Sequence, residues 1–86
     1  MCIQEIFSEI LKERKRQNEL HPNDDHSYME WAAILAEECG EAVKELNNLQ
    51  EKSSQDLSDV KTELIHTAAV CFRILEKAFQ KYWQSV

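Results

Sequence analysis

The sequence predicts an all-α protein, and three observations lead to this fold class. The 86 residues include one glycine and one proline, which is few for a protein built from many turns and strands. Apolar side chains recur three and four positions apart over long stretches, which is helical spacing. Short polar segments separate three such stretches. We therefore expect a single helical domain over residues 1–86, an antiparallel bundle with three main helices.

The first helix is predicted over residues 2–19. Its apolar residues recur at helical spacing and precede a charged run, Lys12-Glu13-Arg14-Lys15-Arg16; they are Ile3, Ile6, Phe7, Ile10 and Leu11. Residues 22–25, with the sequence Pro-Asn-Asp-Asp, then break the pattern.

The second helix is predicted to begin near Tyr28 and to end near Gln50. Ser27 and Glu30 have the spacing of a capping box, in which each side chain accepts a hydrogen bond from the other residue's amide. The expected inner stripe alternates steps of four and three: Tyr28, Ala32, Leu35, Cys39, Ala42, Leu46 and Leu49. Residues 51–55 are polar and form a connection of the length that joins antiparallel helices.

The third helix is predicted to begin near Asp56 and carries two apolar stripes. The first contains Val60, Leu64, Thr67, Cys71, Ile74 and Ala78; the second contains Ile65, Ala68, Phe72, Leu75 and Phe79. The second helix can cover only one stripe, so the other meets either the first helix or another copy of the chain. Because a chain this short buries only about 60–65% of its unfolded surface alone, we expect a homo-oligomer, a homodimer or a homotetramer.

The overall charge and the cysteines narrow the function classes. A formal charge of −6 argues against binding to a nucleic-acid backbone, which needs a concentrated excess of Lys and Arg. The cysteines are odd in number and too scattered for a disulfide framework; they are Cys2, Cys39 and Cys71. No apolar stretch approaches the roughly 20 residues of a membrane span. We expect a cytoplasmic protein with no membrane partner.

Two acidic clusters lie inside this apolar helical sequence. Glu38 and Glu41 share one stripe at the edge of the second helix, and Glu63 and His66 occupy the matching place on the third. In antiparallel helices these pairs can face each other, where carboxylates about 5 Å apart repel by roughly 3 kcal/mol at an effective dielectric constant near 20. A hard divalent cation such as Mg²⁺ or Mn²⁺ would reverse that repulsion. The alternative is a solvated acidic face.

These residues resemble the signature of the MazG-like all-α nucleoside triphosphate pyrophosphohydrolases, Glu-Glu-x-x-Glu followed by Glu-x-x-Asp on the next helix. The segment Glu37-Glu38-Cys39-Gly40-Glu41 matches the first half, and Glu63 begins the second. Residues 30–36 and 42–47 look like the flanking parts of the family's helix, and residues 13–17 look like its first helix. The resemblance covers roughly residues 10–75. The family's aspartate is replaced by His66, a neutral nitrogen ligand that shifts preference toward Mn²⁺ or later transition metals.

The resemblance implies a metal-dependent hydrolase that splits a nucleoside triphosphate into a monophosphate and pyrophosphate. Its metal ligands would be Glu38, Glu41, Glu63 and His66, with Mg²⁺ as cofactor and Mn²⁺ as a possible substitute. Glu37 or Glu38 would be the base for the attacking water. Candidate phosphate contacts are Arg14, Lys15, Arg16 and Arg73.

Several alternatives stay open at this stage. His66 could instead be a histidine at the edge of the core bonded to a carboxylate, with Asp59 as a replacement ligand. Glu63-x-x-His66 also suits a di-iron carboxylate bundle if a dimer supplies two copies. A helical interaction module that lacks turnover is the non-enzymatic option. Gly40 predicts a close approach or a helix crossing.

The aromatic and loop residues near the second helix are expected to have structural roles. Tyr28 and Trp31 could stack on a base, but their place at a helix start favours packing. We expect no ligand role for the loop residues His21, Asp25 and His26.

Overall fold

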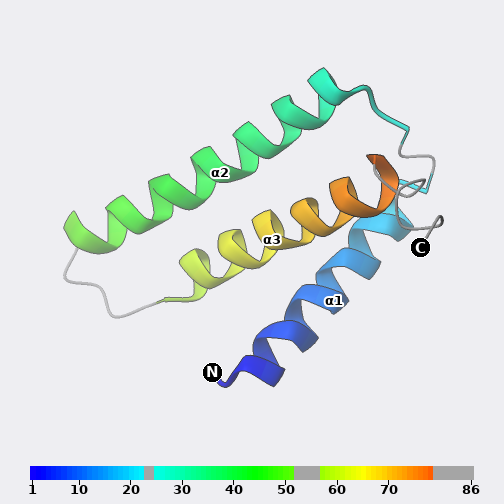
Figure 1. The fold of residues 1–86 in the computed structure, drawn as a ribbon. Coiled ribbons are helices and arrows are strands. Elements are labelled where there is room, and N and C mark those ends of the chain that lie inside the picture. The colour runs from blue at the N-terminus through cyan, green and yellow to red at the C-terminus, as the bar shows by residue number, and fades with distance from the viewer. Residues whose placement is uncertain (23–24, 52–56, 79–86) are drawn as a thin grey trace.

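The computed structural model describes residues 1–22, 25–51 and 57–78, which form three helices (Figure 1). They are α1 (Ile3–Leu20), α2 (Tyr28–Glu51) and α3 (Ser58–Ala78). All regular structure in these ranges is helical, which confirms the predicted fold class, and the predicted helix bounds lie close to those observed. Residues 52–55 of the predicted connection, Asp56 and Phe79 lie outside the described ranges.

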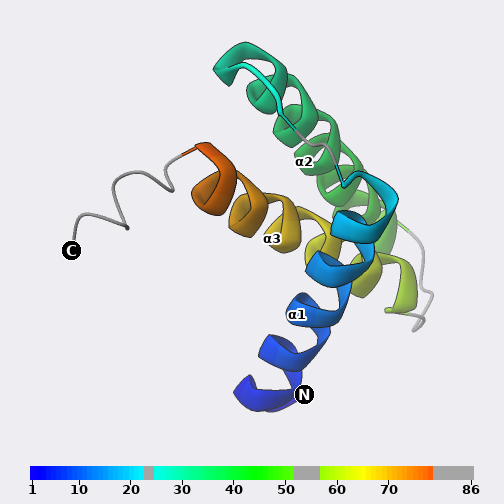
Figure 2. The same cartoon turned by 90° about the vertical axis from the view of Figure 1, so that its right-hand side faces the viewer.

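Helix α3 is the central element of the fold. Helix α2 runs antiparallel along one side of it, and α1 crosses its other side (Figures 1 and 2). Among the described residues α1 and α2 do not pack against each other. The second face of α3 is therefore covered by α1, one of the two options that the sequence left open.

The start of α2 is the capping box predicted from the sequence. The Glu30 amide donates to Ser27 Oγ at 3.2 Å, and the Ser27 amide donates to Glu30 Oε1 at 2.9 Å. Two amides that have no partner within the helix are thereby satisfied. This local arrangement sets the point from which α2 places its acidic residues beside α3.

The buried interior is small and divided between apolar and polar side chains. Its apolar part consists of Ile10, Trp31, Ala42, Val60, Ala69 and Val70, and its polar part of Glu13, Gln17 and Arg73. All three polar residues lie where α1 meets α3. The α1–α3 contact thus depends on hydrogen bonding as well as on apolar burial.

The predicted inner stripe of α2 is partly wrong. Ala42 is buried as predicted, but Tyr28, Ala32, Cys39 and Leu46 are exposed. Trp31, which the predicted stripe did not include, is only 3% exposed. The helix is rotated because the large indole of Trp31 packs inward, with the Arg73 guanidinium carbon 5.4 Å from its ring centroid. The first stripe of α3 also differs from the prediction, because Leu64 and Cys71 are exposed, as is Leu75 of the second stripe.

The rotation leaves apolar side chains on the outer side of α2. Six exposed residues recur there at steps of three and four and define the α2 outer stripe: Met29, Ala32, Ala36, Cys39, Val43 and Leu46. Gly40 lies beside this stripe, and a Cβ built there meets nothing within 4 Å. Among the described residues, therefore, no part of the chain itself makes the predicted close approach at Gly40.

Two expectations about covalent and membrane chemistry can be compared with the structure. The thiols of Cys2, Cys39 and Cys71 are free and exposed, whereas the predicted apolar stripes had placed Cys39 and Cys71 on inner faces. Within the described ranges, each helix is too short or too polar to cross a lipid bilayer.

Candidate metal centre

The predicted acidic residues meet where α2 packs on α3. One ligand atom each from Glu38, Glu63 and His66 lies within 4.8 Å of the other two. Glu38 belongs to α2, whereas Glu63 and His66 are one turn apart on α3. The expected juxtaposition across antiparallel helices is therefore confirmed for these three residues, which we call the metal cluster.

Thr67 ties the two helices together at the cluster. Its hydroxyl lies 2.8 Å from the main-chain oxygen of Glu63 and 3.2 Å from that of Glu38, so it can donate to either. Ala42 of α2 and Val60 of α3 are buried one turn away. The small side chains at this contact allow the two helices to approach closely. The Thr67 hydroxyl sets the position of Glu38 along the helix axis relative to Glu63.

Two carboxylate oxygens of the cluster are buried without a partner. Glu38 Oε2 and Glu63 Oε2 are closed to solvent and accept no hydrogen bond from the described residues. Burial, followed by interaction with Glu41, raises the pKa of both carboxyl groups. Buried anionic oxygens without donors are costly, and a cation bound between them would remove that cost.

The remaining predicted acidic residues lie at the rim. Glu41 and Glu37 are exposed. Glu41 is outside the group of three, but its carboxyl group is close enough to Glu63 to raise that residue's pKa. Asp59 is exposed in the first turn of α3 and is not among the clustered ligand atoms.

Glu13 is a buried carboxylate next to the cluster that the sequence reasoning did not single out. It is 8% exposed and accepts three hydrogen bonds: two from Arg16, at 2.7 and 2.8 Å, and one from Gln17, at 2.8 Å. The Arg16 bonds, more than the opposing effect of burial, lower the pKa of Glu13. A signal existed, because Glu13 and Gln17 continue the helical spacing of Ile3, Ile6 and Ile10 on α1.

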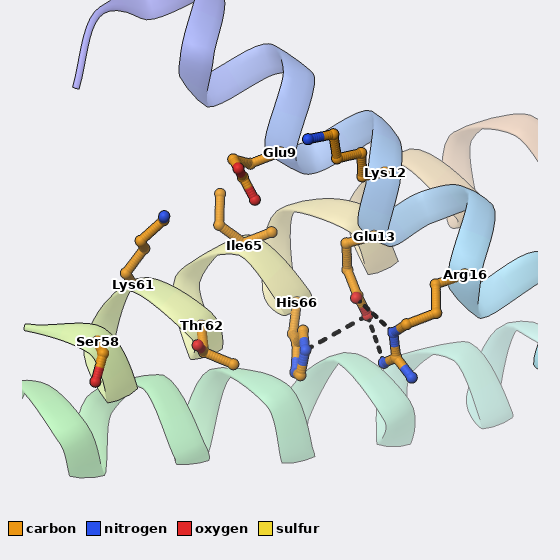
Figure 3. A pocket seen from close by; sticks show the side chains of 9 residues that line it. All are labelled: Glu9, Lys12, Glu13, Arg16, Ser58, Lys61, Thr62, Ile65 and His66. Atoms are coloured by element: carbon orange, nitrogen blue, oxygen red, sulfur yellow. Dashed lines mark hydrogen bonds and ion pairs between the residues drawn. The ribbon is translucent and has the colours of Figure 1, made fainter.

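His66 lies between two carboxylates from different helices. Its Nε2 atom is 3.5 Å from Glu13 Oε2, and its Nδ1 atom is 4.0 Å from Glu63 Oε2. Figure 3 shows the imidazole beside Glu13, which Arg16 holds from the other side. The two interpretations of His66, cation ligand and histidine bonded to a carboxylate at the core edge, are both compatible with this position.

The predicted basic residues divide into paired, exposed and pocket-lining groups. Arg14 pairs with Glu76 of α3, and Lys15 is exposed. Arg16 is held by Glu13. Arg73 is 6% exposed and donates from Nη1 to Gln17 Oε1 at 3.1 Å.

Two pockets adjoin the cluster and share a wall made by Glu13, Arg16 and His66. The first, of about 330 Å³, opens between α1 and the start of α3, with Lys12 and Lys61 at its edge (Figure 3). The second, of about 350 Å³, includes Glu38 and Arg73 in its lining. Arg16 and Arg73 are thus the two predicted phosphate contacts that share a pocket with a cluster carboxylate.

The residues around the start of α2 are placed only partly as expected. Trp31 is buried, and the His26 ring meets it edge-on with centroids 4.7 Å apart. Tyr28 is 64% exposed, so its predicted packing role is wrong in this chain. His21 and His26 line the second pocket but are not part of the metal cluster.

No protein-family model, curated protein or solved structure matches this chain. The features that bear on function are therefore those of the residues themselves. These are a mixed carboxylate and imidazole cluster, two buried oxygens without a donor, and two arginines on the adjoining pocket.

Proposed function

We propose that the protein is a metal-dependent nucleoside triphosphate pyrophosphohydrolase. The observation that carries the proposal is the convergence of Glu38, Glu63 and His66 from two helices, with two of their carboxylate oxygens buried and unpartnered. A second observation supports the proposal: the segment of residues 37–41 and the residue Glu63 match the signature of the MazG-like pyrophosphohydrolases. Each support alone fits a structural acidic cluster, whereas together they favour a site that binds a metal and a polyphosphate.

The donor set suits a divalent cation. Glu38, Glu63 and His66 would hold it, and Glu41 would add a carboxylate from the rim. Mg²⁺ is the ion that the family resemblance implies, whereas the imidazole of His66 favours Mn²⁺. When bound, such an ion neutralises phosphate charge and lowers the pKa of a coordinated water.

The chain's own residues would divide the remaining work. Glu38, or Glu37 beside it, would accept the proton as the water oxygen bonds to the α-phosphorus and the bond to the bridging oxygen breaks. Pyrophosphate would leave with the electron pair of that bond. Arg16 and Arg73 line the pocket next to Glu38 and would contact phosphate oxygens, while Arg14 and Lys15 would act only after leaving their present positions.

Pyrophosphate release tests this proposal. We expect release from one or more nucleoside triphosphates with Mg²⁺ or Mn²⁺, and a fall of about 100-fold or more in Glu38→Gln. Glu45→Gln is the matched control, because Glu45 lies two turns further along the same helix, outside the cluster. Absence of release with both metals, or equal rates in the two variants, would reject the hydrolase and favour the helical interaction module.

We further propose that the active form is a homodimer or homotetramer assembled through the α2 outer stripe. The heptad-like spacing of Met29, Ala32, Ala36, Cys39, Val43 and Leu46 is that of helices that pair in bundles. Light scattering after size exclusion should give at least twice the monomer mass for the wild type. Val43→Glu should give the monomer mass, and an exclusively monomeric wild type would reject the assembly.

A further inference from the structure

We infer that Glu13 is a positioning residue that makes His66 a nitrogen ligand, so that the cluster prefers a first-row transition ion over Mg²⁺. The inference rests on the metal site of the proposed function, but not on turnover. It assigns a role to a carboxylate on α1, a helix that supplies no ligand atom to the cluster.

The first step of the argument is that Glu13 is held in place. Its two carboxylate oxygens accept three hydrogen bonds from Arg16 and Gln17, all between 2.7 and 2.8 Å. Gln17 is itself bonded to the buried Arg73 at 3.1 Å. A buried carboxylate with this many donors has one orientation, so its position relative to α3 is defined.

The second step concerns the two ring nitrogens of His66. A neutral imidazole has one N–H donor and one lone pair, and a carboxylate facing one nitrogen favours the N–H there. Glu13 Oε2 is 3.5 Å from Nε2, while Nδ1 is on the side of Glu63, at 4.0 Å from its Oε2. The Nδ1 lone pair is therefore directed toward the cluster, as in other metal sites where an outer carboxylate orients a ligating histidine.

The third step is the chemistry of the donor set. Two carboxylates and one imidazole differ from the all-oxygen environment that Mg²⁺ prefers. Imidazole nitrogen binds Mn²⁺, Co²⁺ and Zn²⁺ with affinities that generally rise in that order. Because the Glu13 carboxylate lies behind the ring, 3.5 Å from Nε2, it orients the imidazole with Nδ1 toward the cluster and strengthens this preference.

Metal binding in the absence of nucleotide tests the inference directly. Calorimetric titration of the wild-type protein with Mg²⁺, Mn²⁺ and Co²⁺ should show Mn²⁺ and Co²⁺ binding about 10-fold or more tightly than Mg²⁺. The visible spectrum of bound Co²⁺ should report nitrogen ligation. Equal affinities for Mg²⁺ and Co²⁺, or a Co²⁺ spectrum with oxygen ligands alone, would overturn the inference.

Two variants separate the ligand from the residue that orients it. His66→Asp replaces nitrogen with oxygen and should remove most of the preference for Co²⁺ over Mg²⁺. Glu13→Gln should weaken Co²⁺ binding about 10- to 100-fold, with a smaller change for Mg²⁺. Glu9→Gln, one turn earlier on α1 and also beside the first pocket, is the control.

The same variants also distinguish positioning of His66 by Glu13 from a general loss of structure. If Glu13→Gln lowers the affinity for both ions equally, or behaves like Glu9→Gln, Glu13 does not position His66. Should Glu13→Gln lose helicity by circular dichroism, the wild-type and His66→Asp metal series still decide the ligand assignment. Selective metal binding without pyrophosphate release would reject the hydrolase but support this inference. Pyrophosphate release without selective metal binding would support the hydrolase but reject this inference.

Discussion

A carboxylate lies at each of the two helix contacts of α3, and the two carboxylates differ in their hydrogen-bond donors. On the α1 side, Glu13 accepts three hydrogen bonds and its pKa is lowered. On the α2 side, Glu63 has a buried oxygen without a donor and its pKa is raised. A carboxylate that is satisfied by its own chain stabilises the fold, whereas one left unsatisfied is costly to bury unless it is protonated or binds an external partner.

This difference separates acidic residues that the chain itself supplies with donors from those that it does not. Glu13 and Glu63 are equally compatible with helical sequence, and neither stands out by residue type. The available donors distinguish the two residues. Arg16 and Gln17 donate to Glu13, whereas the charged groups that influence Glu63 within the described part of the chain are Glu38, Glu41 and His66. Three predictions test this contrast in order of decreasing effect, and a fourth tests the outward side of α2.

Removing the satisfied carboxylate should destabilise the protein most. Glu13→Ala removes the 2.8 Å hydrogen bond of the buried Gln17 amide, which keeps only a 3.5 Å contact with the main-chain oxygen of His66, while the half-exposed Arg16 guanidinium can turn to water. The expected cost is about 2 kcal/mol in the free energy of unfolding. Urea unfolding of metal-free protein measures this loss, with Glu9→Ala as the control. A loss no larger than that of Glu9→Ala would mean that the hydrogen bonds of Glu13 contribute little.

Neutralising the unsatisfied carboxylate should have the opposite effect. Glu63→Gln removes repulsion from Glu38 and Glu41, so the metal-free protein should gain about 1–2 kcal/mol of stability. The same variant should lose most of the stabilisation that added Mn²⁺ gives the wild type. Thermal unfolding with and without Mn²⁺ checks both expectations, and a destabilised metal-free variant would contradict the contrast.

The same contrast should be visible in how the free energy of unfolding changes with pH. Because the pKa values of Glu38 and Glu63 are raised on folding, the folded state binds more protons than the unfolded state between the ordinary and the raised values. Their contribution is therefore favourable at low pH and is lost as the pH rises through that range. Glu13, with a lowered pKa, contributes in the opposite direction, losing its stabilisation as the pH falls.

A variant isolates this effect, because Glu38→Gln/Glu63→Gln keeps Glu13 unchanged. The stability of the variant relative to the wild type, both free of metal, should grow by about 1 kcal/mol or more as the pH rises from acid to neutral. Urea unfolding at a series of pH values gives this difference. A difference that is constant with pH would show that the two carboxyl groups titrate normally.

The smallest effect concerns the outward side of the same part of α2. Since a Cβ at Gly40 meets open space, Gly40→Ala should stabilise an isolated chain by about 0.5–1 kcal/mol through helix propensity. If a second copy packs closely over the α2 outer stripe, the added methyl group should instead weaken assembly. Unfolding at low and high protein concentration distinguishes the two results.

Much of the fold could be predicted because its signals are local. Helical spacing defined the three helices, and Ser27 and Glu30 marked the start of α2. The pairing of Glu38 with Glu63 and His66 followed from register on antiparallel helices. The inner stripe of α2 was misjudged because both sides of the helix carry apolar residues, and periodicity cannot say which side faces α3.

The helices, the acidic stripes and the histidine at the last position of the signature could be predicted from the sequence, because these features depend on residue type and spacing along one helix. Only the tertiary structure decided that α1 crosses α3 so that Glu13 meets His66, and that Arg73 reaches Gln17 and Trp31. These contacts join residues 42 or more positions apart in the sequence. Their physical basis is the burial of polar groups, which must find hydrogen-bond partners wherever packing places them.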